Sequence, residues 1–399
     1  MLLRAAPLAL LAAACGTPAP AGPTFFKNVL PLTQAQCTAC HSAGGIAPFA
    51  LDTYEAAKPM AAAMASAVAA RRMPPWLASD SCGTPFVESR VLTAEQIAVF
   101  EKWAQAGAPE GNKADAPPTA ATSSQRLKKV DATLAMPAPY TPSTTRRDDY
   151  RCFIIDPKLA ASTIVTAYDI APGSQKVVHH VILYSVRRAD AVAEDAKDPT
   201  AGWECFGGVG ISSTGALGAW APGGSAVVYP FGTGIRVEPD QVLAMQVHYN
   251  TDNGTEADTT SVKLTYGAGG ETAATLLPLV ARRFSIPPGA TGYSYSQRFN
   301  YTLGFPLKLW GFLPHMHTLG KTITMRAGVG GTMDTCLVDI PRWDFHWQSI
   351  YRLAKPVKVN AGDTVRVRCH FDNVSNETIV YGENTGDEMC FATISMTGH

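Results

Sequence analysis

The chain has 399 residues, which is enough for two to four domains at roughly 100–200 residues per domain. Lysine and arginine together number 33, as do aspartate and glutamate, so the formal net charge is zero. This balance argues against a nucleic-acid-binding protein, because such a protein needs a basic surface to neutralise phosphates. After the first 15 residues, no apolar run approaches the roughly 20 residues that span a bilayer, which excludes a polytopic membrane protein.

Residues 1–15 are typical of an export signal peptide. Arg4 supplies a positive charge, and a short apolar stretch rich in Leu and Ala follows it. The segment that ends at Cys15 resembles a bacterial lipobox, in which the cysteine carries a lipid anchor; the alternative is a plain secretory signal with an incidental cysteine. Both interpretations predict an exported protein, either periplasmic or anchored to the outer membrane as a lipoprotein, where disulfides persist.

Residues 24–112 are predicted to form a small all-α domain. Residues 54–72 contain only one strong helix breaker, Pro59, and residues 92–103 open with a Thr–Gln capping box. Residues 113–147 are rich in Ala, Pro, Thr and Ser with few large apolar side chains, so they are predicted to be a linker. A linker of about 35 residues would let the helical domain approach the rest of the protein and swing away.

The second half of the chain is predicted to be all-β. From Arg151 on, short runs rich in Val, Ile, Thr, Tyr and Phe alternate with Gly, Pro, Asn and Asp clusters, which is typical of β-sandwiches. About 250 residues are too many for one sandwich. We therefore predict two all-β sandwich (jelly-roll-like) domains, at residues 148–267 and 283–399.

A short motif in the helical region predicts a haem. Cys37, Cys40 and His41 form C-x-x-C-H, the attachment sequence of a c-type haem, in which two thioethers fix the porphyrin and the histidine reaches the iron. The alternative is a C-x-x-C redox pair, but no thioredoxin-like strand–helix pattern surrounds it. The segment resembles the cytochrome c-like modules fused to bacterial oxidoreductases, so one haem c per chain is expected.

The second axial ligand of this haem is predicted to be Met73. Met60 and Met64 are also candidates, but they lie in an Ala-rich helix and can be core residues. Met73 directly precedes two prolines that end the helix and make a rigid loop. A thioether presented from such a loop suits an axial role and would raise the haem potential.

Five histidines fall into three groups within predicted strands: His179 with His180, His248 alone, and His315 with His317. An H-x-H pair on a strand places both imidazoles on one face, because the side-chain period is two. Adjacent histidines need a bulge or a strand end to reach one metal. Imidazole suits Zn, Cu, Fe and Ni, so spacing alone leaves a catalytic zinc site with three histidines open.

The sequence around these histidines resembles the copper type II, ascorbate-dependent monooxygenases over residues 148–399. The resemblance implies two β-sandwich domains with one copper each. In that family the first copper takes an adjacent histidine pair and the histidine of a Gln-Val-His-Tyr strand, which correspond to His179, His180 and His248. The second takes an H-x-H pair and the methionine of an Asp-Glu-Met-Cys segment, which correspond to His315, His317 and Met389.

The resemblance also implies a function. His315, His317 and Met389 would form the catalytic oxygenation site, since a soft thioether favours the Cu(I) that binds O2, and the other site would transfer electrons. The expected reaction is hydroxylation of a C–H bond in a small organic substrate. Electrons would come through the fused haem or from an ascorbate-like reductant, and the reverse direction, copper to haem, stays open. The alternatives are an electron-transfer or copper-binding protein without oxygenase activity, and a protein whose β domains bind a maturation or adhesion partner.

Three positions of this chain differ from the peptide-hydroxylating member of the family. That enzyme holds a carboxylate with an arginine two residues before its H-x-H pair, where this chain has Leu313. It also uses an asparagine and a tyrosine after its ligand methionine, where this chain has Phe391 and Thr393. A less polar substrate than a glycine-extended peptide is therefore expected.

The resemblance implies two disulfides, Cys152–Cys205 and Cys369–Cys390. It leaves open whether Cys82 and Cys336 pair. His346, His370 and His399 lie in no motif, and we expect them to be structural or solvent-exposed.

Overall fold

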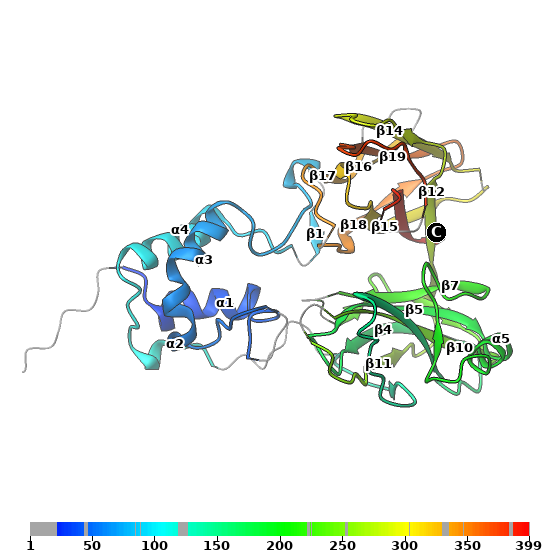
Figure 1. Ribbon diagram of the computed structural model, residues 1–399, viewed down its shortest axis with the longest axis horizontal. Helices are drawn as coiled ribbons and strands as arrows, with labels where there is room; N and C mark the ends of the chain where they lie inside the picture. The colour runs from blue at the N-terminus through cyan, green and yellow to red at the C-terminus, as the bar shows by residue number, and fades with distance from the viewer. Residues whose placement is uncertain are drawn as a thin grey trace, which may run out of the picture.

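The structure, a computed structural model, describes residues 22–398 except 44–46, 84, 88, 119–126, 222–223, 225, 252–253, 303, 329–334, 346 and 383–385. The predicted signal peptide with Cys15, and the histidines His346 and His399, lie outside the described residues. Two β domains are stacked on one another, and a helical domain lies beside them (Figure 1).

The helical domain packs its helices around a small aromatic core that includes Phe25, Phe100 and Trp103. Its elements are η1 (Phe25–Val29), α1 (Leu30–Gln36), α2 (Tyr54–Ala57), η2 (Lys58–Met60), α3 (Ala61–Ala69) and α4 (Ala94–Gln105). The capping box of α4 is formed, since the side chains of Thr93 and Gln96 each accept a hydrogen bond from the other residue's backbone N–H. The run 54–72 is divided into α2 and α3 by the 3-10 turn at Pro59, which lacks a backbone N–H.

The first β domain is a sandwich whose two layers share one core. One layer has the order β6-β3-β10-β5-β7 and the other contains β9-β4-β11-β2. The strands are β2 (Ala132–Ala135), β3 (Asp148–Ile155), β4 (Thr163–Ala171), β5 (Val178–Arg187), β6 (Trp203–Glu204), β7 (Ser213–Trp220), β8 (Val227–Val228), β9 (Thr233–Val237), β10 (Gln241–Asn250) and β11 (Ser261–Tyr266). A short helix, α5 (Arg188–Asp195), follows β5.

The second β domain is a sandwich of β18-β15-β21-β12 and β14-β19-β16-β17 around a second core. The strands are β12 (Thr272–Ala281), β13 (Ser285–Ile286), β14 (Tyr293–Asn300), β15 (Leu307–His315), β16 (Gly320–Gly328), β17 (Thr335–Ile340), β18 (Tyr351–Val359), β19 (Thr364–Phe371), β20 (Ile379–Val380) and β21 (Cys390–Gly398). The prediction of two β-sandwiches is thus confirmed.

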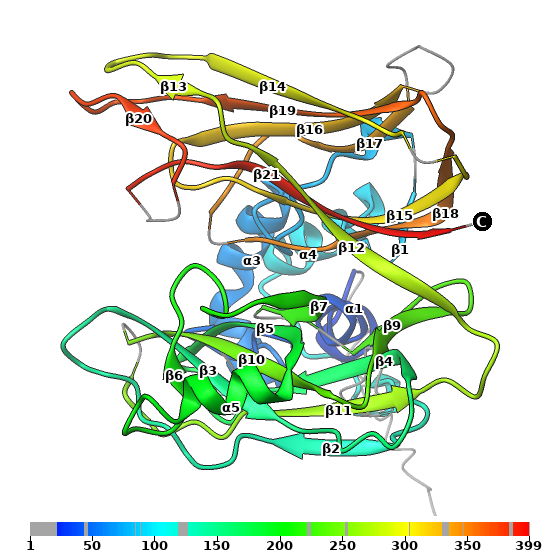
Figure 2. The ribbon, with the colours of Figure 1, turned by 90° about the vertical axis from the view of Figure 1, so that its right-hand side faces the viewer.

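Residues 267–283, which the predicted domain bounds leave between the two β domains, are largely a strand. Strand β12 occupies most of this segment, pairing with β21 along residues 274–281 and in parallel with β9 along residues 272–274. One sheet therefore runs through both domains, and Figure 2 shows β12 crossing from the first domain to the second. The second domain begins at β12 rather than at residue 283.

The predicted linker, residues 113–147, is wrong at both ends. Residues Lys113–Asp115 form a 3-10 helix against η1, and β2 pairs with β11 as an edge strand of the first β domain. The hydroxyl of Tyr140 donates to Asp149 at 2.6 Å, which attaches this segment to β3. A strand of four residues carries too little periodicity to be found in an Ala- and Thr-rich sequence.

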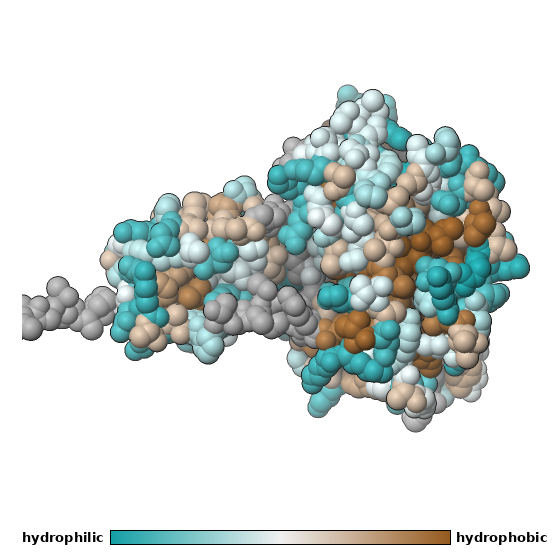
Figure 3. Space-filling view, turned by 90° about the horizontal axis from the view of Figure 1, so that it is seen from below, coloured by the Kyte–Doolittle hydropathy of each residue, from teal (hydrophilic) through white to brown (hydrophobic). Residues whose placement is uncertain are grey.

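The helical domain is fixed to the second β domain by the loop between α3 and α4. Its strand β1 (Phe86–Val87) pairs with β18, and Cys82 forms a disulfide with Cys336 on β17. Trp76 and Phe86 pack against Tyr351, with ring centroids 5.0 and 5.6 Å apart. The helical domain forms a narrower lobe beside the β domains (Figure 3), and these contacts contradict the expectation that it swings freely.

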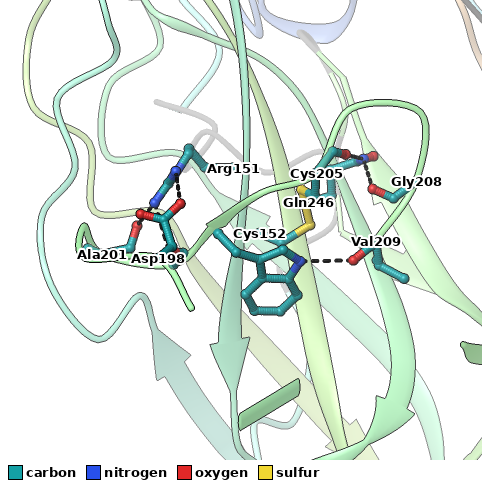
Figure 4. The surroundings of a disulfide bond; sticks show 10 residues. Arg151, Cys152, Asp198, Ala201, Cys205, Gly208, Val209 and Gln246 are labelled. Carbon is teal, nitrogen blue, oxygen red and sulfur yellow. Dashed lines mark hydrogen bonds and ion pairs between the residues drawn. A yellow bond between two sulfur atoms is a disulfide. The ribbon is translucent and has the colours of Figure 1, made fainter. Parts of the chain in front are cut away.

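Both disulfides implied by the resemblance are present in the β domains. Cys152–Cys205 joins β3 to the end of β6, and Cys369–Cys390 joins β19 to β21. Beside the first disulfide, Arg151 donates to Asp198 at 2.8 Å and to the backbone carbonyl of Ala201 at 2.9 Å (Figure 4). The guanidinium of Arg151 is buried, so it fixes the loop before β6 against β3.

Arg151→Met is expected to lower the free energy of unfolding by about 3 kcal/mol, because it leaves buried partners without their donor. The control Lys197→Met breaks an exposed ion pair with Glu194 and should cost at most about 0.5 kcal/mol. Urea unfolding measures both. Arg151 holds the pKa of Asp198 well below its ordinary 3.8, so the ion pair stabilises above that pH and the difference from wild type shrinks in acid. An equally small loss of unfolding free energy in Arg151→Met and Lys197→Met would contradict the stabilising role of Arg151.

Candidate metal centres

A β-bulge brings the three histidines of the first β domain together. His248 on β10 lies opposite His180 on β5, but the next residue, Tyr249, lies opposite Val178, so His179 is the extra residue of a bulge. The Nδ1 atom of His248 lies 3.1 Å from Nδ1 of His179 and 3.3 Å from Nδ1 of His180. The bulge therefore lets the adjacent histidines His179 and His180 both reach His248, as two neighbouring ligands on a strand require.

The surroundings of this three-histidine centre orient its ligand atoms. Nε2 of His248 lies 2.9 Å from the carboxylate of Asp148, which leaves Nδ1 to face the other two rings. The ring of Tyr150 stacks on His248, with centroids 4.2 Å apart and an interplanar angle of 3°. Burial, followed by the charges of the neighbouring histidines, holds the pKa of His180 well below its ordinary value. A neutral imidazole is the form that binds a metal.

The second centre begins at the end of β15. Nδ1 of His315 lies 2.6 Å from the side-chain oxygen of Gln348, and Nδ1 of His317 lies 3.0 Å from the backbone carbonyl of Asp387. The two rings have centroids 5.1 Å apart. Since each Nδ1 is engaged by an acceptor, each ring keeps Nε2 for a metal. Burial is the main reason that the pKa of His315 falls to about 4, which keeps this ring neutral.

A buried carboxylate links the H-x-H segment to Met389. Glu388 accepts hydrogen bonds from the backbone N–H groups of His317, of Leu319 at 2.9 Å and of Met389 at 2.8 Å. The same oxygen serves His317 and Met389, so the two backbones meet at one atom. Burial raises the pKa of Glu388 to about 7 against the effect of these bonds. The Cys369–Cys390 disulfide fixes the residue after Met389.

Glu388→Ala is expected to weaken copper binding at the second centre by about 10–100-fold, because the two ligand-bearing segments lose their shared acceptor. Copper affinity is measured by competition with a chelator, and the three-histidine centre should be unaffected. The control is Glu256→Ala, which removes only an exposed partner of Lys176. Equal copper affinity in Glu388→Ala and in the control would contradict the positioning role of Glu388.

The donor atoms of both centres fit copper. Three imidazoles suit several metals, including zinc. If Met389 adds its thioether to the two imidazoles, the set is softer and suits Cu(I), whereas protein zinc sites use Cys, His and carboxylate ligands. Among the groups that lower the pKa of His180, His315 of the second β domain is the one with the smallest effect.

The residues expected to shape the substrate site share a face of one sheet with His315. Phe391 lies opposite His315 and Thr393 lies opposite Leu313 in the pairing of β15 with β21. The rings of His315 and Phe391 have centroids 6.0 Å apart. Two apolar side chains, Leu313 and Phe391, therefore lie on the same sheet face as His315.

The C-x-x-C-H motif forms a compact turn after α1. The backbone N–H groups of Cys40 and His41 both donate to the carbonyl of Cys37, and the two cysteines are free thiols. Nδ1 of His41 lies 3.0 Å from the carbonyl of Phe49, which leaves Nε2 for an axial bond. These donor atoms fit covalent attachment and axial ligation of a haem c.

The methionine candidates of the helical domain differ in their surroundings. Met64 is 6% exposed and belongs to the helical core, and Met60 packs against the same core. Met73 instead lines a cavity of about 350 Å³. The axial role of Met73 stays a prediction.

Sequence reasoning did not identify several residues that support these centres. Asp148, Gln348 and Glu388 orient ligands, but only Glu388 stood next to a recognised ligand in the sequence. The other two contact their histidines across 100 and 33 residues, respectively. Separations of this size leave no local pattern. His370, which was expected to be structural or exposed, hydrogen-bonds to Thr322.

Two family models match the chain: copper type II ascorbate-dependent monooxygenase, N-terminal domain, over residues 133–256, and the corresponding C-terminal domain over residues 272–396. The helical domain lies outside both matches. The putative DBH-like monooxygenase protein 2 of Homo sapiens is 24% identical over 239 residues, which are 54% of this chain and 46% of that protein. The tyramine beta-hydroxylase of Caenorhabditis briggsae is 23% identical over 272 residues, 60% of this chain and 44% of that protein. The chain thus spans less than half the length of the curated relatives it matches.

Proposed function

Because the chain belongs to the copper type II ascorbate-dependent monooxygenase family, whose two domain models together match more than half of it, we propose that it is an exported copper-dependent monooxygenase. It hydroxylates a C–H bond of a small organic substrate with O2. The observation that carries this proposal is the pair of unlike centres, one with three clustered imidazoles and one with two imidazoles whose segment meets the backbone of Met389 at Glu388. One copper at each centre would supply electron storage at the first and O2 reduction at the second.

Each residue of the second centre has a distinct task. His315, His317 and Met389 hold the metal, and Gln348 and the carbonyl of Asp387 keep both imidazoles oriented with Nε2 toward it. At the first centre the carboxylate of Asp148 engages Nε2 of His248, so that Nδ1 of this ring is oriented toward the metal. This use of Nδ1 at one centre and Nε2 at the other follows from the hydrogen bonds around the rings.

The substrate is less polar than a glycine-extended peptide. Leu313 and Phe391 contribute apolar side chains beside His315, and Thr393 contributes only a hydroxyl. Apolar side chains of this kind bind a hydrocarbon or aromatic group by removing it from water. No fixed positive charge stands at Leu313 to select a carboxylate.

Electrons reach the copper centres from a haem c in the helical, cytochrome c-like domain. Cys37 and Cys40 attach the haem, and His41 and Met73 are its axial ligands. The fixed contact of the helical domain with the second β domain supports this role, because it keeps donor and acceptor close. An ascorbate-like reductant or a redox protein would reduce the haem or the copper centres.

The protein is exported to the periplasm or anchored at the outer membrane through Cys15. Three disulfides among the described residues support an oxidising compartment. Within the described part of the chain, no helix has the length and apolar character to cross a membrane.

Oxygen consumption tests the function directly. Copper-loaded protein is supplied with ascorbate, ¹⁸O-labelled O2 and a panel of small apolar compounds, and one compound is expected to gain a labelled hydroxyl. Copper binding at both centres without oxygen consumption across the panel would instead favour an electron-transfer or copper-binding protein. Failure to bind copper would leave the β domains as a binding module for another protein.

A further inference from the structure

The outer sheet of the second β domain, β14-β19-β16-β17, carries four arginines on one face. Arg298 of β14 lies opposite Arg366 of β19, and Arg366 lies opposite Arg326 of β16. Arg368 is two residues beyond Arg366 on the same strand, so its side chain is on the same face. Because neighbouring strands are about 5 Å apart, these four residues form one basic patch, called here the arginine cluster.

Strand alternation turns the arginine cluster away from the core. Met325 and Val367, which are sequence neighbours of its members, are fully buried in the core of the second β domain. Arg298 and Arg368 are exposed, and the other two arginines are partly buried. Figure 2 shows β14, β19 and β16 in the layer that lies farthest from the first β domain. The cluster therefore faces the surroundings of the protein.

The positive charge of the arginine cluster is poorly compensated by the protein itself. In the part of the chain that the structure describes, Arg298, Arg366 and Arg368 form no ion pair with a carboxylate. Within the four strands, the described residues of this face include one carboxylate, Asp339, which lies opposite Thr324. Like charges that lie opposite one another destabilise a sheet. Burial and the charges of the three other arginines accordingly lower the pKa of Arg366.

The rest of this face is polar. The residues that share it with the arginines on β14, β16 and β19 are serine, threonine, asparagine, glycine and histidine. A stable protein–protein interface has a core enriched in aromatic and other apolar side chains, which these residues do not supply. A second copy of the chain would bring arginines against arginines. The face is therefore suited to a surface that presents many negative charges rather than to a protein partner.

We propose that the arginine cluster binds the phosphate headgroups of an anionic membrane surface, so that this sheet docks the exported protein on the membrane. A guanidinium offers five N–H donors in a fork that matches the geometry of a phosphate. Attraction to an anionic lipid surface requires basic side chains close to that surface and no enclosed pocket. The inference rests on the proposed export of the protein and not on the copper or haem centres.

Vesicle binding tests the arginine cluster directly. The full chain carries Cys15→Ser, so that no lipid anchor contributes, and is mixed with vesicles of phosphatidylglycerol or of neutral phosphatidylcholine. Binding should be tighter to phosphatidylglycerol and should weaken as salt rises, because ions screen exposed charges. Combining Arg298→Gln, Arg366→Gln and Arg368→Gln should weaken binding to phosphatidylglycerol on the order of 100-fold, as expected for three basic side chains near an anionic surface.

The control combines Lys129→Gln, Lys176→Gln and Lys197→Gln, which remove the same charge from exposed sites of the first β domain. The urea midpoint of Arg366→Gln should equal or exceed that of wild type, because the substitution relieves like-charge repulsion. Equal binding of the arginine variant and the lysine variant to phosphatidylglycerol would overturn the proposal. Binding to soluble polyphosphate but not to the vesicles would also overturn it, in favour of a soluble polyanion. Copper content and turnover test the proposed function separately, since these variants leave both centres intact.

Discussion

Met389→Ile is expected to lower the copper content from two to about one per chain and to abolish turnover, because the second centre loses its thioether ligand. Met389→His should keep copper bound, since imidazole is also a good ligand, but it should suppress O2 chemistry by making the donor set harder. Copper analysis and oxygen consumption separate the two variants.

A second methionine provides the matched control. Met325 on β16 is fully buried in the core of the same domain, and Met325→Ile should cost less than about 1.5 kcal/mol in unfolding free energy without changing copper content. Two tightly held coppers and wild-type turnover in Met389→Ile would show that Met389 is also only a core residue.

Replacing both attachment cysteines, in Cys37→Ala with Cys40→Ala, is expected to abolish turnover driven by a protein reductant. Turnover with excess ascorbate should survive, because ascorbate acts on copper directly. In the intact protein, rapid-mixing absorbance should show reduced haem reoxidising when Cu(II) is present and O2 is absent. Since the helical domain is fixed to the second β domain, this rate should not depend on protein concentration.

The opposite outcome is equally specific. If haem in the intact protein stays reduced under these conditions while the same protein hydroxylates substrate with ascorbate alone, the haem does not supply the copper centres. The helical domain would then serve another partner.

The two β-sandwiches and the bulge at the first centre could be predicted from the sequence. Strand-like runs of β-branched and aromatic residues are a local signal, and two adjacent histidines can share a metal only where strand alternation is broken. The structure has that irregularity opposite His248. The capping box of α4 was predictable for the same reason, because it depends on residues only three positions apart.

The connections between domains could not be predicted in this way. Strand β1 has two residues, and its pairing with β18 depends on a register more than 250 residues away. The Cys82–Cys336 disulfide spans 254 residues and resembles no pattern in the sequence. Strand β12 has Pro278 in its middle and no clean alternation of buried and exposed residues, so its sequence carries little strand signal.

Metal analysis of the copper-loaded, full-length protein tests the central claim most directly. The proposed centres predict two coppers and one haem per chain, with one copper lost in Met389→Ile and the other in His248→Ala. Protein that contains zinc and no copper after copper loading would contradict the assignment of both centres.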